Sequence, residues 1–283
     1  MVGARPTWNE YVPWARSALG ARFDRLDELF HKANVQAIRA TAENQQFFRE
    51  LGVILADAAR DYNAERPAAR LFAQSKLELA TKSFESAVEK SYRMNVLRNK
   101  NFPDPPTGGW IVPGSWYSQI NDMVRGTLVC SYMDSLAWLA ERLRVEADKR
   151  GLRLEFNSEV RDEGYYAFHL YVKIPSIELE TREGDGPVKS AFTVPVEIQL
   201  TTQLQNSLRD VTHFFYEQRR LAGLRPDWKW RHGDPQFRAS YMSHTLHLVD
   251  ALIVELRDHV SAARETAHAS NATDITSTDN SRE

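Results

Sequence analysis

One acidic side chain stands in the middle of an alternating apolar segment. Apolar residues occupy positions 192, 194, 196, 198 and 200, which predicts a β-strand with one buried face. Glu197 and Gln199 lie on the opposite face, where a carboxylate is rarely found unless it binds or catalyses something. Glu197 is therefore a candidate for a residue that binds a ligand or takes part in catalysis. The alternative is an edge strand on which Glu197 is simply solvated.

Two lysines and a serine recur every four residues at Lys82, Ser86 and Lys90. The sequence predicts a helix from Pro67 to about Val96, on which these three side chains share one face. The two ammonium groups would then lie about 12 Å apart along the helix axis, a row suited to a triphosphate. Alternatively, the row is a solvated face on which acidic residues four positions away pair with the basic ones.

A second alternating segment carries an aromatic ring and an imidazole. Its apolar residues stand at 168, 170, 172 and 174, and the other face presents Tyr165, Ala167, His169 and Tyr171. The small Ala167 between the ring and the imidazole leaves room for a flat ligand. Cross-strand aromatic packing under a helix is the alternative.

The sequence predicts helices first and then strands alternating with helices. The sequence predicts a helical N-terminal extension over 1–70, a mixed helix and strand domain over 71–222, and a loop and helix packed on it over 223–266. The small, polar segment 267–283 is expected to be disordered.

Within the domain, Asp122 directly precedes an apolar strand at 124–130, and a helix begins at Ser131 or Asp134. A further strand is expected near 152–156. The loop 99–117 is rich in proline and glycine, and its two tryptophans either cover a site or pin the loop to the core.

The C-terminal part of the domain predicts a hairpin connection at 180–188 and a helix at 203–221. A last amphipathic helix runs from about 235 to 264. Its apolar residues at 246, 249, 252, 253 and 256 are expected to face inward.

The composition of the chain limits the classes of protein to which it can belong. The chain has 283 residues, 42% of them hydrophobic, which suffices for one large domain with a substantial extension. The net charge of −2 gives no overall basic field for nucleic acid. The one cysteine, Cys130, lies in an apolar run and indicates a buried, reduced thiol. Since no long apolar run suggests a signal peptide or membrane span, a cytoplasmic protein is expected.

Four motifs follow one another in a fixed order, namely Lys82-x3-Ser86-x3-Lys90, Asp122 before a strand, Gly164-Tyr165-x3-His169 and Glu197-Ile198-Gln199. Over about 75–220 they resemble the synthetase domain of the RelA/SpoT family, in its branch of small alarmone synthetases and their toxin relatives. The resemblance implies an α+β fold, a nucleotidyltransferase-like mixed sheet flanked by helices, with helical N- and C-terminal extensions. It also implies a cytoplasmic, Mg²⁺-dependent pyrophosphokinase that transfers the β,γ-pyrophosphate of ATP to the 3′-hydroxyl of GDP or GTP.

On the ATP side, the resemblance implies that Lys82, Ser86 and Lys90 bind phosphates. Asp122 would ligate Mg²⁺, with Glu197 as a second carboxylate at the metal and as the general base. Such an arrangement suits phosphoryl-type transfer, which depends mostly on positioning and charge neutralisation.

On the acceptor side, the resemblance implies that Tyr165 stacks on the base and that Arg161 and His169 contact phosphates. Gln199, which belongs to the same motif as Glu197, is placed in the acceptor site as well.

The chain departs from the family pattern at four positions. Ala80, Thr127 and Thr201 stand where the family usually has arginine, and Ala167 stands where it has serine. Three of these changes remove a positive charge from a site that binds phosphates. Arg125, on the same strand face as Thr127, can compensate for one of them. Without compensation the site is weakened, inactive or shaped for another acceptor.

Three functions are therefore compared, namely (p)ppGpp synthesis, toxin-type pyrophosphorylation of the tRNA 3′ end, and nucleotide binding without catalysis. The altered phosphate-binding positions and the basic and aromatic segment 219–231 motivate the RNA hypothesis. The alternative for this segment is two tryptophans packed under the last helix with their flanking charges solvated. The expected partners are ATP and GDP or GTP, with tRNA, a second copy of the chain or an antitoxin as further candidates, and no membrane.

Overall fold

The computed structural model describes residues 4–67, 69–162, 164–183, 186–209 and 227–279. Within these residues a six-stranded mixed sheet has the order β1-β3-β6-β5-β4, and β2 pairs with β3 beside β1. Only the β3–β6 pair is parallel among the described strands. The strands are β1 (Phe72–Gln74), β2 (Ala80–Thr81), β3 (Val124–Cys130), β4 (Arg153–Val160), β5 (Tyr166–Glu183) and β6 (Gly186–Thr202).

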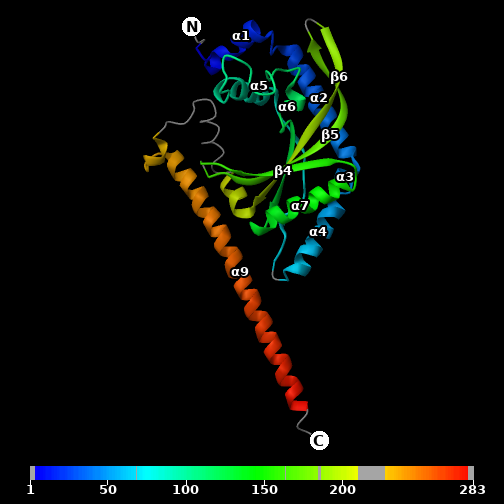
Figure 1. The fold of residues 1–283 in the computed structure, drawn as a ribbon, viewed down its shortest axis with the longest axis vertical. Coiled ribbons are helices and arrows are strands. Elements are labelled where there is room, and N and C mark those ends of the chain that lie inside the picture. Colours follow the sequence, from blue (N-terminus) through cyan, green and yellow to red (C-terminus); the bar gives the residue numbers. More distant parts are fainter. Residues whose placement is uncertain (1–3, 68, 163, 184–185, 210–226, 280–283) are drawn as a thin grey trace.

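Helices flank this sheet, which confirms the predicted α+β class (Figure 1). They are α1 (Trp8–Leu19), α2 (Arg25–Asn44), α3 (Gln46–Arg49), α4 (Leu51–Glu65), α5 (Phe84–Tyr92) with a π-helical turn (Arg93–Leu97), α6 (Trp116–Gln119), α7 (Asp134–Asp148), a helix at 203–209, a 3-10 turn (Trp228–Trp230) and α9 (Pro235–Asp279). The far ends of β5 and β6 extend as a hairpin beside α2, where Asn34 Nδ2 donates to the Glu180 carbonyl over 2.7 Å. Figure 1 shows α9 as a long rod whose C-terminal half extends beyond the sheet.

The strand that carries Glu197 lies inside the sheet. β6 pairs with β3 on one side and with β5 on the other, so the edge-strand alternative is wrong. The predicted alternation is confirmed, because Val194, Val196, Ile198 and Leu200 are fully buried. Glu197 is itself only 3% exposed. A buried carboxylate is costly unless it is hydrogen-bonded, so this position requires partners.

The helix predicted from Pro67 to Val96 is wrong in its first half. β1 and β2 occupy this part of the chain, and the helix begins only at Phe84. Ser83 is its N-cap, since the Ser83 hydroxyl oxygen accepts a hydrogen bond from the Ser86 N–H over 3.2 Å. Ala80 and Thr81 instead pair with β3. Lys82 therefore lies before the helix.

Several predicted elements are confirmed, including the strand at 124–130 and the helix that begins at Asp134. The hairpin at 180–188 is confirmed as well, although its strands extend further, to the Glu183–Gly186 pair. In the loop 99–117, Trp116 is fully buried, and Trp110 packs against Trp14 with ring centroids 5.7 Å apart. These contacts favour tryptophans that pin the loop to the core.

Polar contacts attach α9 to the sheet domain. The Thr202 hydroxyl donates to Asp250 over 2.6 Å, and Arg257 Nη2 lies 3.0 Å from Asp134 Oδ2. Because Asp250 and Arg257 face the domain, Leu252, Ile253 and Leu256 are turned to solvent. Their predicted inward orientation is therefore wrong.

The helix α9 also continues to Asp279, whereas the sequence predicts disorder from Ala267. Extending an existing helix adds one hydrogen bond per residue without a new nucleation step, so a polar composition does not by itself end it. Among the described residues, no helix combines the length and apolar character that crossing a membrane requires.

A glycine allows α9 to approach the strand that carries His169. Gly164 has φ +85°, and a Cβ at this position would lie 2.5 Å from Ser243 Cβ and 2.6 Å from the Ser240 carbonyl oxygen. Any side chain would therefore displace the helix backbone. Tyr165 follows Gly164 directly in the chain. The contact between Gly164 and α9 therefore helps to position Tyr165, which is a candidate site residue.

We expect Gly164→Ala to lower the free energy of unfolding through both backbone strain and overpacking. The matched control is Gly151→Ala, at φ +70° with no atom within 4 Å of the added Cβ. The control should cost roughly 1–2 kcal/mol for its left-handed backbone, and Gly164→Ala about 1–3 kcal/mol more. Urea unfolding measures both, and equal losses would contradict the close packing of α9 at Gly164.

Candidate active site

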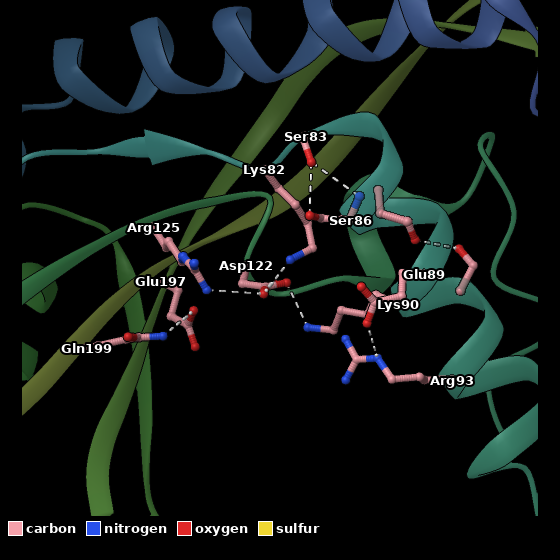
Figure 2. Close-up of polar contacts among 12 residues, drawn as sticks. Lys82, Ser83, Ser86, Glu89, Lys90, Arg93, Asp122, Arg125, Glu197 and Gln199 are labelled. Atoms are coloured by element: carbon pink, nitrogen blue, oxygen red, sulfur yellow. Dashed lines mark hydrogen bonds and ion pairs between the residues drawn. The ribbon is translucent and has the colours of Figure 1, made fainter. Parts of the chain in front are cut away.

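Two lysines meet one aspartate between β3 and α5 (Figure 2). Lys82 Nζ lies 2.9 Å from Asp122 Oδ2, and Lys90 Nζ lies 2.7 Å from Asp122 Oδ1. The side chain of Lys82 is 6% exposed and that of Asp122 14%. The prediction of two ammonium groups 12 Å apart on one helix face is therefore wrong, because Lys82 precedes the helix and both lysines bind the same carboxylate.

The charges in this cluster do not cancel. Burial alone would raise the pKa of Asp122, but the charges of Lys90 and Lys82 and their hydrogen bonds hold it well below its usual range. Burial lowers the pKa of Lys82, and although Asp122 raises it, the charges of Lys90 and Arg125 lower it further, so that it lies below its usual value. The half-exposed Arg125 adds a third cation, 3.9 Å from Asp122. An excess of positive charge around one carboxylate suits a phosphate ligand.

The first turn of α5 supplies further hydrogen-bond donors to the same region. Ser83 caps the helix, and its hydroxyl donates to Ser86 Oγ over 2.9 Å. Helix N-termini attract anions because their first backbone N–H groups lack partners within the helix. Ser83 was not among the predicted site residues. The signal was a serine directly before the apolar positions Phe84, Ala87 and Val88.

A second polar cluster surrounds Glu197. His169 Nδ1 lies 2.5 Å from Glu197 Oε1, and Gln199 Nε2 donates to Glu197 Oε2 over 3.1 Å. The Tyr165 hydroxyl is hydrogen-bonded to His169 Nε2 at 2.9 Å. The structure thus brings together four of the predicted site residues, and they supply the partners that the buried carboxylate requires.

The two clusters lie side by side on the sheet. Arg125 on β3 is the Cα partner of Glu197 on β6, and Figure 2 shows Asp122, Arg125 and Glu197 near one another. Burial and the negative charges of Glu197, Glu159 and Asp122 raise the pKa of Tyr171 to about 12. Glu197 and Asp122 therefore both raise the pKa of the same phenol, as expected if they belong to one site.

Arg161 lies next to Tyr165 at the rim of this region. Its guanidinium carbon is 5.1 Å from the centroid of the Tyr165 ring, and its Nη2 lies 3.5 Å from Glu159 Oε2. The predicted contact of Arg161 with an acceptor phosphate stays a prediction.

Two of the four positions at which the chain departs from the family pattern line a hollow. Ala80 and Thr127 line it together with Gly126 and Arg125, and its volume is about 220 Å³. A side chain at Gly126 would collide with Leu77 and with the Glu78 backbone. The hollow therefore lies beside two of the positions at which the family has arginine, and Arg125 also lines it.

The side chains at the other two departing positions are buried. Thr201 is buried on β6, where it is the Cα partner of Val129, and Ala167 is buried on β5. The missing arginine at position 201 therefore leaves no space open to a ligand.

The acidic residues fit a metal ion that arrives with a nucleotide better than a permanently held one. Within the described ranges, no group of three or more His, Cys, Asp or Glu residues could hold a metal ion. Both oxygens of Asp122 already accept hydrogen bonds from lysines. Mg²⁺ is commonly bound by one or two carboxylates together with substrate phosphates and water. Asp122 and Glu197 are the two carboxylates that the resemblance implies for that mode.

Comparisons with known proteins complete the description. No protein-family model matches the sequence, and no curated protein matches it. Small alarmone synthetase 1 from Bacillus subtilis is similar at 16% identity and TM-score 0.49, covering 83% of this chain and 98% of that chain. A GTP pyrophosphokinase family protein from Streptococcus pneumoniae is similar at 16% identity and TM-score 0.47, covering 80% and 92%. Similarities of this size do not by themselves establish an activity.

We expect Asp122→Asn to destabilise the protein by about 3 kcal/mol at neutral pH, because it leaves the buried Lys82 without its counter-ion. The pKa of Asp122 is lowered in the folded state, so the folded protein binds fewer protons than the unfolded chain below about the ordinary value of 3.8. The stabilisation is therefore complete above that value and is lost as the pH falls. The difference between wild type and variant should shrink below about pH 4.

Urea unfolding between pH 7 and pH 3 measures this difference. The control is Asp57→Asn, which removes an exposed ion pair to Arg60 and should cost less than about 1 kcal/mol. A loss for Asp122→Asn that is as small as that of the control, or that does not vary with pH, contradicts the buried charge cluster.

Proposed function

We propose that this chain is an ATP-dependent pyrophosphokinase of the RelA/SpoT type, which transfers the β,γ-pyrophosphate of ATP to the 3′-hydroxyl of a guanine nucleotide. The observation that carries the proposal is the cation-rich Lys82–Asp122–Lys90 cluster beside the buried Glu197. Phosphoryl-type transfer needs charge neutralisation and positioning more than covalent participation by the protein. The lysine cluster supplies the charge neutralisation, and the cluster around Glu197 supplies the positioning.

On the ATP side, Lys82, Lys90 and the N-terminus of α5 bind the phosphates, and Ser86 adds a hydroxyl. Ala80 lies two residues before Lys82, so the hollow at Ala80 and Thr127 is close enough to take the base of the same nucleotide. Arg125 stands at its edge and can contact the base or a phosphate. The hollow then serves as a base site despite the missing arginines.

Asp122 and Glu197 would hold Mg²⁺ once ATP is bound. The ion supplies charge neutralisation for the transferred pyrophosphoryl group. As Lys82 and Lys90 turn from Asp122 to the phosphates, the carboxylate becomes available to the cation. The lysines thus keep the buried aspartate paired before the nucleotide arrives.

On the acceptor side, Glu197 accepts the proton of the attacking hydroxyl. A positioned general base contributes roughly 10²–10⁴-fold to the rate. The ring of Tyr165 stacks on the acceptor base, a contact worth about 1–3 kcal/mol in nucleic-acid grooves. Arg161, next to that ring, is placed to meet the acceptor phosphates.

A second candidate acceptor is the 3′ end of tRNA. The observation that favours it is Trp230, which is 88% exposed and stands between two basic residues, whereas Trp228 is buried. An exposed indole offers a stacking surface for an unpaired base. Against this, Lys229 and Arg231 form ion pairs with Asp162 and Asp227. The other predicted basic positions, at 219–226, lie outside the described residues.

The test is label transfer from γ-³²P-ATP in the presence of Mg²⁺, with GDP, GTP, ATP or bulk tRNA as the acceptor. We expect label on a guanine nucleotide, and no transfer when EDTA removes the metal. Glu197→Gln should lower the rate by roughly 10²–10⁴-fold while the protein stays folded. Glu155→Gln, an exposed change on β4, which β5 separates from β6, is the matched control and should retain activity.

Label on tRNA alone would mean that the acceptor is RNA and not a guanine nucleotide. Binding of tRNA that weakens steeply with salt would support that result. Bound nucleotide without label on any acceptor would mean a catalytically inactive binding module. Full activity in Glu197→Gln would exclude Glu197 as the base.

A further inference from the structure

A chain of three side chains crosses from the start of β5 to β6 and ends on the candidate base. The Tyr165 hydroxyl is bound to His169 Nε2 at 2.9 Å, and His169 Nδ1 is bound to Glu197 Oε1 at 2.5 Å. His169 is 7% exposed. Both ring nitrogens are therefore engaged inside the protein.

The direction of these hydrogen bonds follows from their acceptor. An ionised carboxylate can only accept, so the proton of this hydrogen bond belongs to His169 Nδ1. In a neutral imidazole the other nitrogen is then an acceptor, and it takes the hydroxyl proton of Tyr165. No N–H of the ring is left to donate to a phosphate.

We propose that His169 is a positioning residue for Glu197 and that the Tyr165 hydroxyl fixes the imidazole in the tautomer this role requires. The proposal rests on the proposed function, within which Glu197 is the base. It replaces the phosphate contact that the motif resemblance implies for His169. It also gives Tyr165 a second role, since the ring faces the acceptor while the hydroxyl supports the base.

The sheet explains why the carboxylate is held so firmly. His169 and Gln199 are Cα partners across β5 and β6, and their side chains bind different oxygens of Glu197. With one donor on each oxygen, the carboxylate has little freedom to rotate. Displacing a reacting group by about 1 Å can cost 10²-fold in rate.

The two roles of His169 differ in the kinetic constant that they affect. A phosphate ligand contributes to acceptor binding, so its loss raises the acceptor KM. A positioning residue acts on the base during proton transfer, so its loss lowers kcat while KM stays the same. Steady-state kinetics with the acceptor that takes label therefore separate them.

We expect His169→Ala to lower kcat by about 10²-fold with the acceptor KM within about twofold of wild type. His169→Asn keeps an N–H donor near the place of Nδ1 and should recover at least about tenfold of that loss. Tyr165→Phe keeps the stacking ring and should lower kcat without raising KM. The control, His259→Ala on the exposed face of α9, should leave both constants unchanged. A raised acceptor KM with unchanged kcat in His169→Ala overturns the proposal.

A measurement without nucleotide or metal separates failure of this proposal from failure of the proposed function. The ¹⁵N chemical shifts of the His169 ring, assigned by comparison with His169→Ala, show which nitrogen carries the proton. We expect the Nδ1-protonated tautomer in the wild type, and a changed Nε2 shift in Tyr165→Phe. An Nε2-protonated ring overturns the proposal even if the enzyme is active. An Nδ1-protonated ring in a protein that transfers no label leaves the orienting contact intact and refutes only the catalytic function.

Discussion

The pairing of β6 between β3 and β5 is the constraint on which the candidate site depends. It buries Glu197, and burial of a carboxylate is tolerated only with hydrogen-bond partners, which β5 and β6 supply as His169 and Gln199. On the other side, the parallel β3 brings Asp122 close through the register of Arg125 with Glu197. One strand thus joins the cation-rich cluster to the buried carboxylate that we propose as the base.

The charge distribution explains why such a site stays folded before any ligand binds. A buried anion between two lysines, with Arg125 nearby, leaves excess positive charge without leaving the carboxylate unpaired. Buried ion pairs contribute little net stability compared with apolar packing, so this cluster is consistent with the proposed binding role. The two lysines thus keep Asp122 paired, and the remaining positive charge suits the polyphosphate that we propose as the ligand.

The sequence predicted those features that depend on local pattern. The alternation at 192–200 predicted the buried strand, and the apolar run after Asp122 predicted β3 with its correct bounds. The position of Lys82 could not be predicted, because the Ser83 cap and the pairing of β2 with β3 override a four-residue spacing that suits a helix. The sequence also did not predict which face of α9 points to solvent. Partners distant in the sequence, such as Asp134, decide which side of that helix packs on the domain. Only the structure shows that both nitrogens of His169 are already engaged.

The most direct test of a site built for a polyphosphate with a metal ion is the affinity of the wild-type protein for a non-hydrolysable ATP analogue, measured by calorimetry with Mg²⁺ and again with EDTA. Asp122 and Glu197 can join the complex only through a cation, whereas the lysines bind phosphate in either condition. The account predicts binding in both conditions, at least about tenfold tighter with Mg²⁺, which corresponds to about 1.4 kcal/mol. Equal affinity with and without the metal, or no binding at all, would contradict it.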